Sequence, residues 1–294
     1  MSRLNQTAEF WDQIELYRPK QFWDLPVIQH YRHKLVSGDE HTEFLPWFAD
    51  TYVPEPFCCG ISLGCGSGFL EREAVRLNIV RHMTGIDIAP GRLKKAAELS
   101  ESLPIEYRRQ NINAISLSEN SLDFAMCKTI LHHINKLEHV LAELKKALRP
   151  GALLYVDEYI GPARFQFQEK VLRIADQALA LIPAPLRRLE YNRWEIKTKI
   201  NRIDPGIVIA ADPSEAIRSD EINGLLKKFF TVVEAHGTGG ALLFRLMDGI
   251  AHNFDPACDD HNNILRTLCT FEENLSRNHL ISDIFKVYVL RNDK

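Results

Sequence analysis

Short apolar runs alternate with helix-like stretches between residues 57 and 160. The apolar runs predict strands at residues 58–63, 82–86, 105–108, 122–127 and 153–157. The stretches between them place apolar residues at helical spacing and predict helices at 70–77, 92–99 and 137–148. Strands that alternate with helices are typical of a parallel sheet covered by helices on both faces.

The flanking segments follow a different pattern. Residues 1–53 are rich in aromatic side chains and predict short helices laid over the core, broken near Pro19, Pro26 and Pro46. Residues 165–182 have an unusually apolar helical pattern, which ends at prolines. Further along, the pattern predicts a helix at 221–230, a strand at 231–235, a glycine-rich turn at 237–240, a helix at 262–278 and a strand at 284–290.

These patterns divide the chain into four parts. They are an N-terminal helical cap at 1–53, an α/β core at 54–160, a helical insertion or lid at 161–220, and a C-terminal part of the core at 221–294 with a helical insertion at 250–282. The predicted fold class is therefore α/β, with a mostly parallel seven-stranded sheet, helices on both faces and an added helical cap.

Composition narrows the class of protein. Among 294 residues, 45% are hydrophobic and 26% are charged, and the formal net charge of −3 argues against a nucleic-acid partner. We expect no transmembrane segment, because no run approaches about 18 consecutive apolar residues. The N-terminal residues lack the apolar region of a secretory signal. The six cysteines have no disulfide-framework or CxxC spacing, so we expect reduced thiols and a cytoplasmic location.

The most informative motif is the run ISLGCGSGFLE at residues 61–71. A predicted strand leads into a glycine-rich turn, and a predicted helix follows at once. Glycines at such a turn allow positive φ and let a ligand approach bare backbone, while the helix start presents free N–H groups. The third glycine comes one residue earlier than in the GxGxxG dinucleotide fingerprint, and no GxxxxGK[ST] phosphate loop is present. The turn therefore suits a ligand other than a nucleotide phosphate.

Asp87 follows at the end of the next predicted strand, in the run Gly85-Ile86-Asp87-Ile88. A carboxylate at this position can accept both hydroxyls of an adenosine ribose. Taken alone, Asp87 would more often be a turn or N-cap residue, since Pro90 and Gly91 follow it. Together with the glycine turn it predicts a ribose anchor.

Four runs now define a resemblance: LGCGSG, GIDIAPGRLKKA, NSLDFAMCKTILHHI and LKKALRPGALLYVDEY. As a set they resemble the cofactor-binding core of class I S-adenosylmethionine (SAM)-dependent methyltransferases, and in particular the subfamily with an LHH element after the fourth strand. The resemblance covers about residues 57–160 and extends weakly to the two C-terminal strands. It implies a Rossmann-like class I methyltransferase fold, SAM as the cofactor and S-adenosyl-L-homocysteine as its product.

The resemblance also implies which residues hold SAM. They are Gly64, Cys65, Gly66 and Gly68 for the methionine and ribose, Asp87 for the ribose hydroxyls, Ile88, Asn111 and Ile112 for the adenine, and Cys127 and Lys128 under the methionine. Tyr31 and Trp47 are expected contacts from the N-terminal cap. The chain departs from the family pattern at Ser62, where the family usually has an acid, and at Asn111, where it usually has Asp. Both departures remove negative charge near a cationic ligand.

Three residues are candidates for catalysis. His133, in the His132-His133 pair, could act as a general base because imidazole titrates near neutrality, although a role in shaping the pocket floor is the better supported interpretation of such a pair. Glu158 or Tyr159, at the end of the fifth strand, could orient or deprotonate an acceptor, since open α/β sheets bind ligands beyond the carboxyl ends of their strands. We expect no metal site, because the ligand types at 258–261 lack partners at zinc spacing.

The predicted function is SAM-dependent methylation of an oxygen or nitrogen on a small-molecule acceptor, in specialised-metabolite or sugar biosynthesis. Such enzymes work mainly by orientation and water exclusion, because the leaving group departs neutral. Two alternatives stay open: a non-catalytic scaffold on the same fold, suggested by Ser62 and Asn111, and a lipid-acceptor enzyme at a membrane surface, suggested by the apolar helix before Arg187-Arg188. An NAD-dependent oxidoreductase is disfavoured by the glycine spacing. A homodimer is possible.

Overall fold

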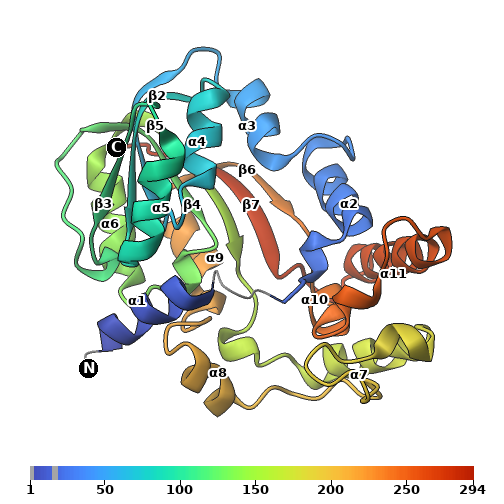
Figure 1. The fold of residues 1–294 in the computed structure, drawn as a ribbon. Coiled ribbons are helices and arrows are strands. Elements are labelled where there is room, and N and C mark those ends of the chain that lie inside the picture. Colours follow the sequence, from blue (N-terminus) through green and yellow to red (C-terminus); the bar gives the residue numbers. More distant parts are fainter. Residues whose placement is uncertain (1–2, 15–18) are drawn as a thin grey trace.

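The computed structural model of the chain describes residues 3–14 and 19–294. A seven-stranded sheet lies at its centre, with the strand order β3-β2-β1-β4-β5-β7-β6 (Figure 1). The strands are β1 Phe57–Leu63, β2 Val80–Asp87, β3 Ile105–Arg109, β4 Leu122–Lys128, β5 Leu148–Tyr159, β6 Thr231–Gly237 and β7 Phe285–Arg291. Strands β1 to β5 pair in parallel, whereas β7 is antiparallel to both β5 and β6. The mostly parallel seven-stranded sheet is confirmed.

Helices precede, connect and follow the strands. They are α1 Arg3–Ile14, α2 Pro26–Ser37, α3 Phe44–Tyr52, α4 Phe69–Arg76, α5 Pro90–Ser100, α6 Leu137–Ala147, α7 Glu169–Leu179, α8 Pro205–Ala211, α9 Ser219–Phe229, α10 Leu243–Met247 and α11 Asp259–Arg277. Among the described residues, no helix combines the length and the apolar character that a bilayer crossing requires.

Each face of the sheet is covered by its own helices. On one face, Phe48 of α3 and Ala74 of α4 pack against Phe124 and Tyr155 of the central strands. On the other face, α6 and α9 bury leucines such as Leu141 against the opposite side chains of the same strands. Successive residues of a strand point to opposite faces. The sheet is therefore buried on both sides, as a parallel sheet requires.

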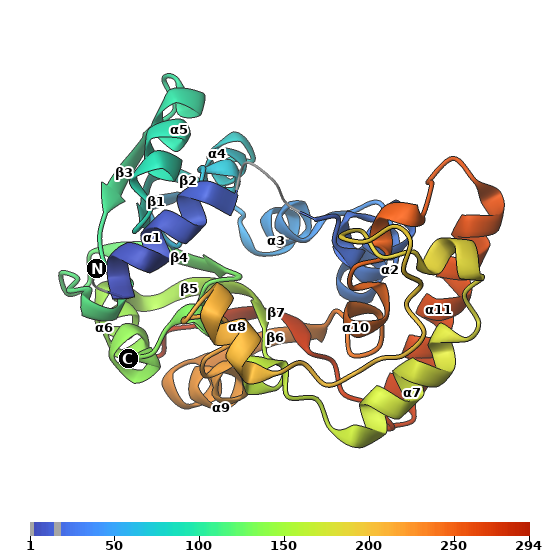
Figure 2. The same ribbon diagram turned by 60° about the horizontal axis from the view of Figure 1, so that its bottom comes forward.

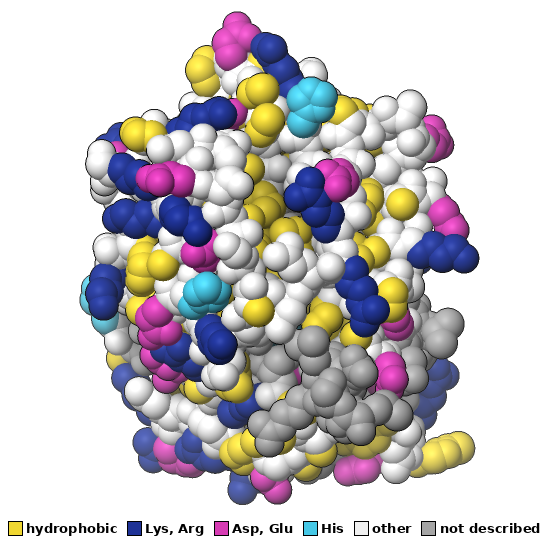
Figure 3. All heavy atoms as spheres, turned by 90° about the vertical axis from the view of Figure 1, so that its left-hand side faces the viewer, with side chains coloured by type: hydrophobic (Ala, Val, Ile, Leu, Met, Phe, Trp, Pro, Cys, Tyr) yellow, Lys and Arg dark blue, Asp and Glu magenta, His cyan; other side chains and the backbone are white. Residues whose placement is uncertain are grey.

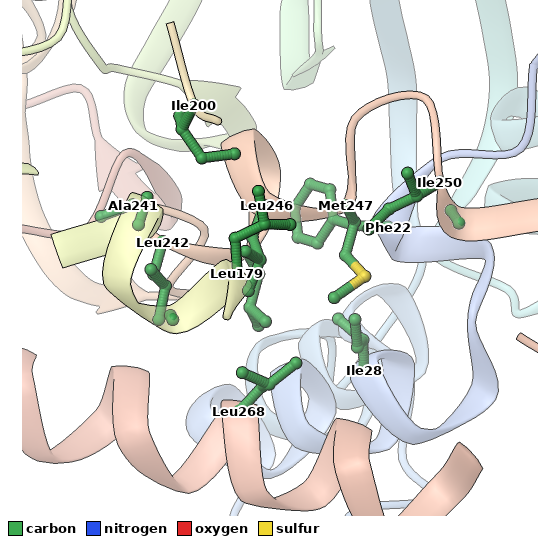
Figure 4. Close-up of a cluster of buried hydrophobic side chains, with 14 of the residues drawn as sticks. Phe22, Ile28, Leu179, Ile200, Ala241, Leu242, Leu246, Met247, Ile250 and Leu268 are labelled. Carbon is green, nitrogen blue, oxygen red and sulfur yellow. The ribbon is translucent and has the colours of Figure 1, made fainter. Parts of the chain in front are cut away.

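A third apolar cluster lies beside the sheet, where β5 ends and β7 begins. It joins α2, α7, α10 and α11, which gather on one side of the sheet in both ribbon views (Figure 1 and Figure 2). Figure 4 shows Ile28, Leu179, Leu246 and Leu268 converging from these four helices. Segments that are more than 200 residues apart in sequence, α2 and α11 among them, thus share one core.

Some predicted boundaries were wrong. Pro26 begins α2, as the break predicted there requires, but Pro46 lies within the first turn of α3 instead of breaking a helix, because a proline is tolerated where the helical N–H has no partner. The apolar helix predicted from residue 165 begins only at Glu169, since Arg164 and Phe165 adopt positive φ values of 51° and 57°. Strand β5 extends beyond the predicted 153–157 at both ends. The short helices α8 and α10 were not predicted, because so few turns carry little periodicity.

Candidate functional site

The glycine turn between β1 and α4 takes a conformation that other residues would strain. Gly64 and Gly68 have φ values of 70° and 75°. A Cβ on Gly64 would lie 2.5 Å from the side chain of Ile130, and a Cβ on Gly68 would collide with the Tyr107 hydroxyl. Both positions therefore need glycine for conformation and for space.

Asp87 ties the end of β2 to this turn. One carboxylate oxygen accepts the Gly66 N–H at 2.8 Å, and the other accepts the N–H groups of Ile88 at 2.7 Å and Ala89 at 2.9 Å. A carboxylate offers about four lone-pair sites, so capacity remains for a ligand. Asp87 is thus both part of the turn's structure and a free acceptor at its mouth.

A pocket of about 220 Å³ opens beside Asp87 and the glycine turn. It is lined by Thr7, Trp11, Gly64, Asp87, Ile88, Arg92, Gln110, Asn111, Ile112, Asn113, Lys128, Thr129, Ile130, His133, Ile134 and Ser214. We call it the smaller pocket. Most of the residues expected to hold SAM belong to this lining, and so does the candidate base His133.

The other residues expected to hold SAM lie behind the pocket wall. Cys127 is fully buried in the sheet, and burial raises the pKa of its thiol. Cys65 is also buried, while Gly66 and Gly68 shape the turn from within. These residues can support the wall but do not line it.

Trp11 of α1 closes one side of the smaller pocket, a contact that sequence reasoning missed. Its ring meets the His133 ring edge-on at 5.2 Å, and the Arg92 guanidinium lies 4.9 Å from the Trp11 ring centroid. Asp12 then accepts the Arg92 N–H at the start of α5, at 3.1 Å. The helix thus covers the pocket through a small set of contacts with α5. Tyr31 and Trp47, the cap residues expected there, lie outside this lining.

A larger pocket, of about 410 Å³, adjoins the smaller one and shares Lys128 and Thr129 with it. Its lining is Trp23, Asp24, Gln29, Arg32, His33, Glu43, Phe44, Leu45, Pro46, Phe69, Leu70, Glu73, Leu77, Lys128, Thr129, Tyr155, Asp157 and Phe285. Apolar and aromatic side chains make up half of this lining, and polar or charged side chains make up the other half.

Two of the charged groups that line the larger pocket, Arg32 and Asp157, have well-defined surroundings. The Arg32 guanidinium lies 5.5 to 5.7 Å from the rings of Phe22, Phe44 and Phe285 and donates a hydrogen bond to Thr238 at 3.1 Å. Burial lowers the pKa of Arg32, against the opposing effect of nearby carboxylates. Asp157 is almost fully buried, and its carboxylate lies 3.5 Å from the Lys128 ammonium.

The candidate residues Glu158 and Tyr159 reach neither pocket. Glu158 is fully buried and accepts hydrogen bonds from the backbone N–H groups of Ile130 at 2.9 Å and Leu131 at 2.6 Å, and it also pairs with His132. The Tyr159 hydroxyl donates to the Pro162 carbonyl at 2.9 Å, and burial raises its pKa. Because side chains alternate along β5, Asp157 faces the larger pocket while Glu158 faces the opposite side of the sheet.

Comparisons with known proteins agree with this geometry. Residues 61–156 match a family model described as a methyltransferase domain. A ubiquinone biosynthesis O-methyltransferase of Methylocella silvestris is 30% identical over 134 residues, which cover 44% of this chain and 51% of that protein. The chain spans about half, or less, of the length of the curated relatives that it matches first.

Two solved structures share the fold over nearly the whole chain. Phosphoethanolamine N-methyltransferase 2 of Haemonchus contortus, in complex with SAM, has a TM-score of 0.55 at 12% identity and covers 98% of this chain and 60% of its own. The [4+2]-cyclase SpnF has a TM-score of 0.52 at 13% identity and covers 98% and 96%. At such identities the likeness concerns the fold alone.

Proposed function

We propose that the chain, whose residues 61–156 match a methyltransferase domain, is a class I SAM-dependent methyltransferase that transfers a methyl group from SAM to an oxygen or nitrogen of a small-molecule acceptor. The observation that carries this proposal is the junction of the two pockets at Lys128 and Thr129. A donor in one pocket and an acceptor in the other would meet there. Specialised-metabolite or sugar biosynthesis remains the proposed setting, and the cytoplasm the proposed location.

SAM would occupy the smaller pocket. Asp87 has about one acceptor site left for a ribose hydroxyl, and Ile88 and Ile112 offer apolar contact to the adenine between them. Gly64 leaves bare backbone where the methionine would pass. Trp11 of α1 would then exclude water from the bound cofactor.

The acceptor would occupy the larger pocket. Phe69, Tyr155 and Phe285 supply apolar walls, and Asp157 lies near the shared residue Lys128. In this arrangement Asp157 would orient the acceptor hydroxyl or amine and receive its proton. Arg32, which has no carboxylate within 4.0 Å among the described residues, would favour an acceptor that carries an anionic group.

The scaffold alternative loses part of its support from the surroundings of Ser62. Glu71 of α4 is buried and interacts with the Ser62 side chain, so a carboxylate does stand behind the glycine turn. The acid absent at position 62 is therefore supplied from another element.

The lipid alternative loses its original support, because Leu172 and Leu179 of α7 point into the core. Tyr191 and Trp194, which are 79% and 91% exposed, keep it testable by co-sedimentation with anionic liposomes. A nucleic-acid partner finds no support in Figure 3, where basic and acidic side chains are interspersed over the face shown.

Calorimetry with SAM and S-adenosyl-L-homocysteine tests the donor site. We expect binding to the wild type that is about 10- to 100-fold weaker in Asp87→Asn, which keeps the size of the side chain but removes its charge. Asp39→Asn, in the exposed loop after α2, is the matched control and should bind like the wild type. Absence of binding to the wild type would end the proposal.

Labelled SAM and a panel of hydroxyl and amine acceptors, with and without a carboxylate or phosphate, test the transfer itself. We expect a labelled product from at least one anionic acceptor. Tight SAM binding without turnover on any member of a broad panel would favour the scaffold alternative.

A further inference from the structure

Three potential metal ligands meet at the edge of the smaller pocket. His132 and His133 come from the turn after β4, and Glu215 comes from the segment before α9. One ligand atom from each residue lies within 4.8 Å of the others. His132 Nε2 is 3.5 Å from one Glu215 oxygen, and His133 Nε2 is 3.8 Å from the other.

A hydrogen-bond partner also fixes the far nitrogen of each imidazole. His132 Nδ1 pairs with Glu158, which is fully buried. His133 Nδ1 lies 3.1 Å from the Ser214 hydroxyl and 3.4 Å from Asp212 Oδ2, a buried oxygen that has no hydrogen-bond partner. A carboxylate or hydroxyl that holds Nδ1 in this way orients the ring of a metal-binding histidine.

With the rings oriented in this way, the Nε2 atom of each histidine faces a carboxylate oxygen of Glu215. When Nδ1 carries the proton, the Nε2 lone pair of each histidine points toward the Glu215 carboxylate, which is itself an acceptor.

The charges of the cluster are also unbalanced. Three carboxylates, Glu158, Asp212 and Glu215, surround the two histidines. Arg164, which donates to the carbonyls of Glu215 and Pro213, is the guanidinium that opposes them. A divalent cation with two neutral imidazoles would leave the cluster neutral.

We propose that His132, His133 and Glu215 bind one divalent transition-metal ion of the Zn²⁺ class. Two imidazoles and one carboxylate form the ligand set of many catalytic zinc sites. Tetrahedral bonds of about 2.0 to 2.1 Å place ligand atoms roughly 3.3 Å apart. The three ligand atoms here lie within 4.8 Å of one another, so a bound ion would draw them closer together. His133 and Ser214 line the smaller pocket, so the remaining coordination position would face it.

The test uses the 294-residue chain without a tag, stripped with a chelator and reloaded with Zn²⁺ or Co²⁺. Elemental mass spectrometry should find one Zn²⁺ per chain after desalting. The Co²⁺ form should show the visible d–d bands of a nitrogen and oxygen site without a thiolate charge-transfer band. A wild type that retains no metal would overturn the proposal, whether or not the protein binds SAM.

Substitutions of the proposed ligands test where the ion binds. Glu215→Gln keeps the shape of the side chain and should weaken Zn²⁺ binding more than 100-fold, and His133→Asn should do the same. Asp212→Asn, which removes the charge beside His133 Nδ1 but no proposed ligand, should weaken binding about 10- to 100-fold. Binding that is unchanged in both ligand variants would overturn the assignment.

A second cluster provides the control. Cys58, Cys59 and Asp123 also bring three ligand types together. The double variant Cys58→Ser, Cys59→Ser should keep the Zn²⁺ stoichiometry and the Co²⁺ spectrum of the wild type. A thiolate band that disappears in this variant, together with the bound metal, would place the ion at the cysteines and refute the histidine site.

Discussion

The smaller and larger pockets share Lys128 and Thr129, yet they are assembled from different parts of the chain. Most of the smaller pocket comes from the turns that follow β1, β2, β3 and β4, and only Thr7, Trp11 and Ser214 come from further away. The larger pocket joins α2 and α3 with α4 and with the ends of β5 and β7. A pocket built from successive strand ends can be predicted from local motifs, whereas one built between distant segments cannot.

The comparison between the two pockets is tested most sharply at the end of β5. Asp157 and Glu158 are adjacent there but face opposite sides of the sheet, and only Asp157 lines the larger pocket. Asp157→Asn should lower kcat about 10²-fold with SAM affinity unchanged, because a proton acceptor at the acceptor pocket is lost. Steady-state assays with labelled SAM and calorimetry measure the two effects separately. An unchanged kcat would remove Asp157 from the proposed chemistry.

Glu158→Gln should act on stability instead. The change removes the buried charge that three backbone N–H groups and His132 contact, and we expect the free energy of unfolding to fall by about 3 kcal/mol. Urea denaturation followed by circular dichroism gives this value. A variant of wild-type stability would mean that the carboxylate does not hold the turn after β4.

Gly64→Ala should damage the smaller pocket and spare the larger one. The added Cβ meets Ile130, and the positive φ adds strain of about 1 to 2 kcal/mol. We expect SAM affinity to fall by about 10-fold or more. Gly38→Ala is the matched control, since Gly38 has a φ of 81° and open space around it. It should lose similar stability and keep SAM affinity, and equal binding losses in both variants would refute the steric argument.

Glu71 makes the stability of the smaller pocket's rear wall depend on pH. Burial raises the pKa of Glu71 from 4.5 to about 7. The stability that protonated Glu71 gives to the folded state is therefore fully present below pH 4.5 and is lost as the pH rises through 7. Glu71→Gln should therefore match the wild type near pH 4.5 and be more stable by about 2 to 3 kcal/mol above pH 7. Glu73→Gln, on the same helix and paired with Arg76, is the control, and unfolding curves across this pH range supply the measurement.

Trp11→Ala should have the smallest effect. The contacts of its ring with Arg92 and His133 cover the smaller pocket, and cation–π contacts are worth about 0.5 to 2 kcal/mol. SAM affinity should fall up to about 10-fold, as measured by calorimetry. Glu9→Ala, at an exposed position of α1, should have no effect, and equal losses in both variants would point to a general loss of α1.

The sequence by itself determined the sheet and the mouth of the smaller pocket. All seven strands were predicted, most of them because they contain short apolar runs between turn residues. Gly64 and Asp87 were predicted to lie together because both follow parallel strands that end at the same edge. Such features depend on residues close together in the chain.

Only the tertiary structure decided the choice between Asp157 and Glu158, the position of Arg32 and the meeting of His132 with Glu215. The face to which a strand residue points depends on what covers the sheet, and both faces of β5 are buried. Arg32 and Glu215 reach their sites through packing of segments distant in sequence, and no local spacing records that packing. Composition and periodicity determine which elements form, but the packing between distant elements determines which side chains meet.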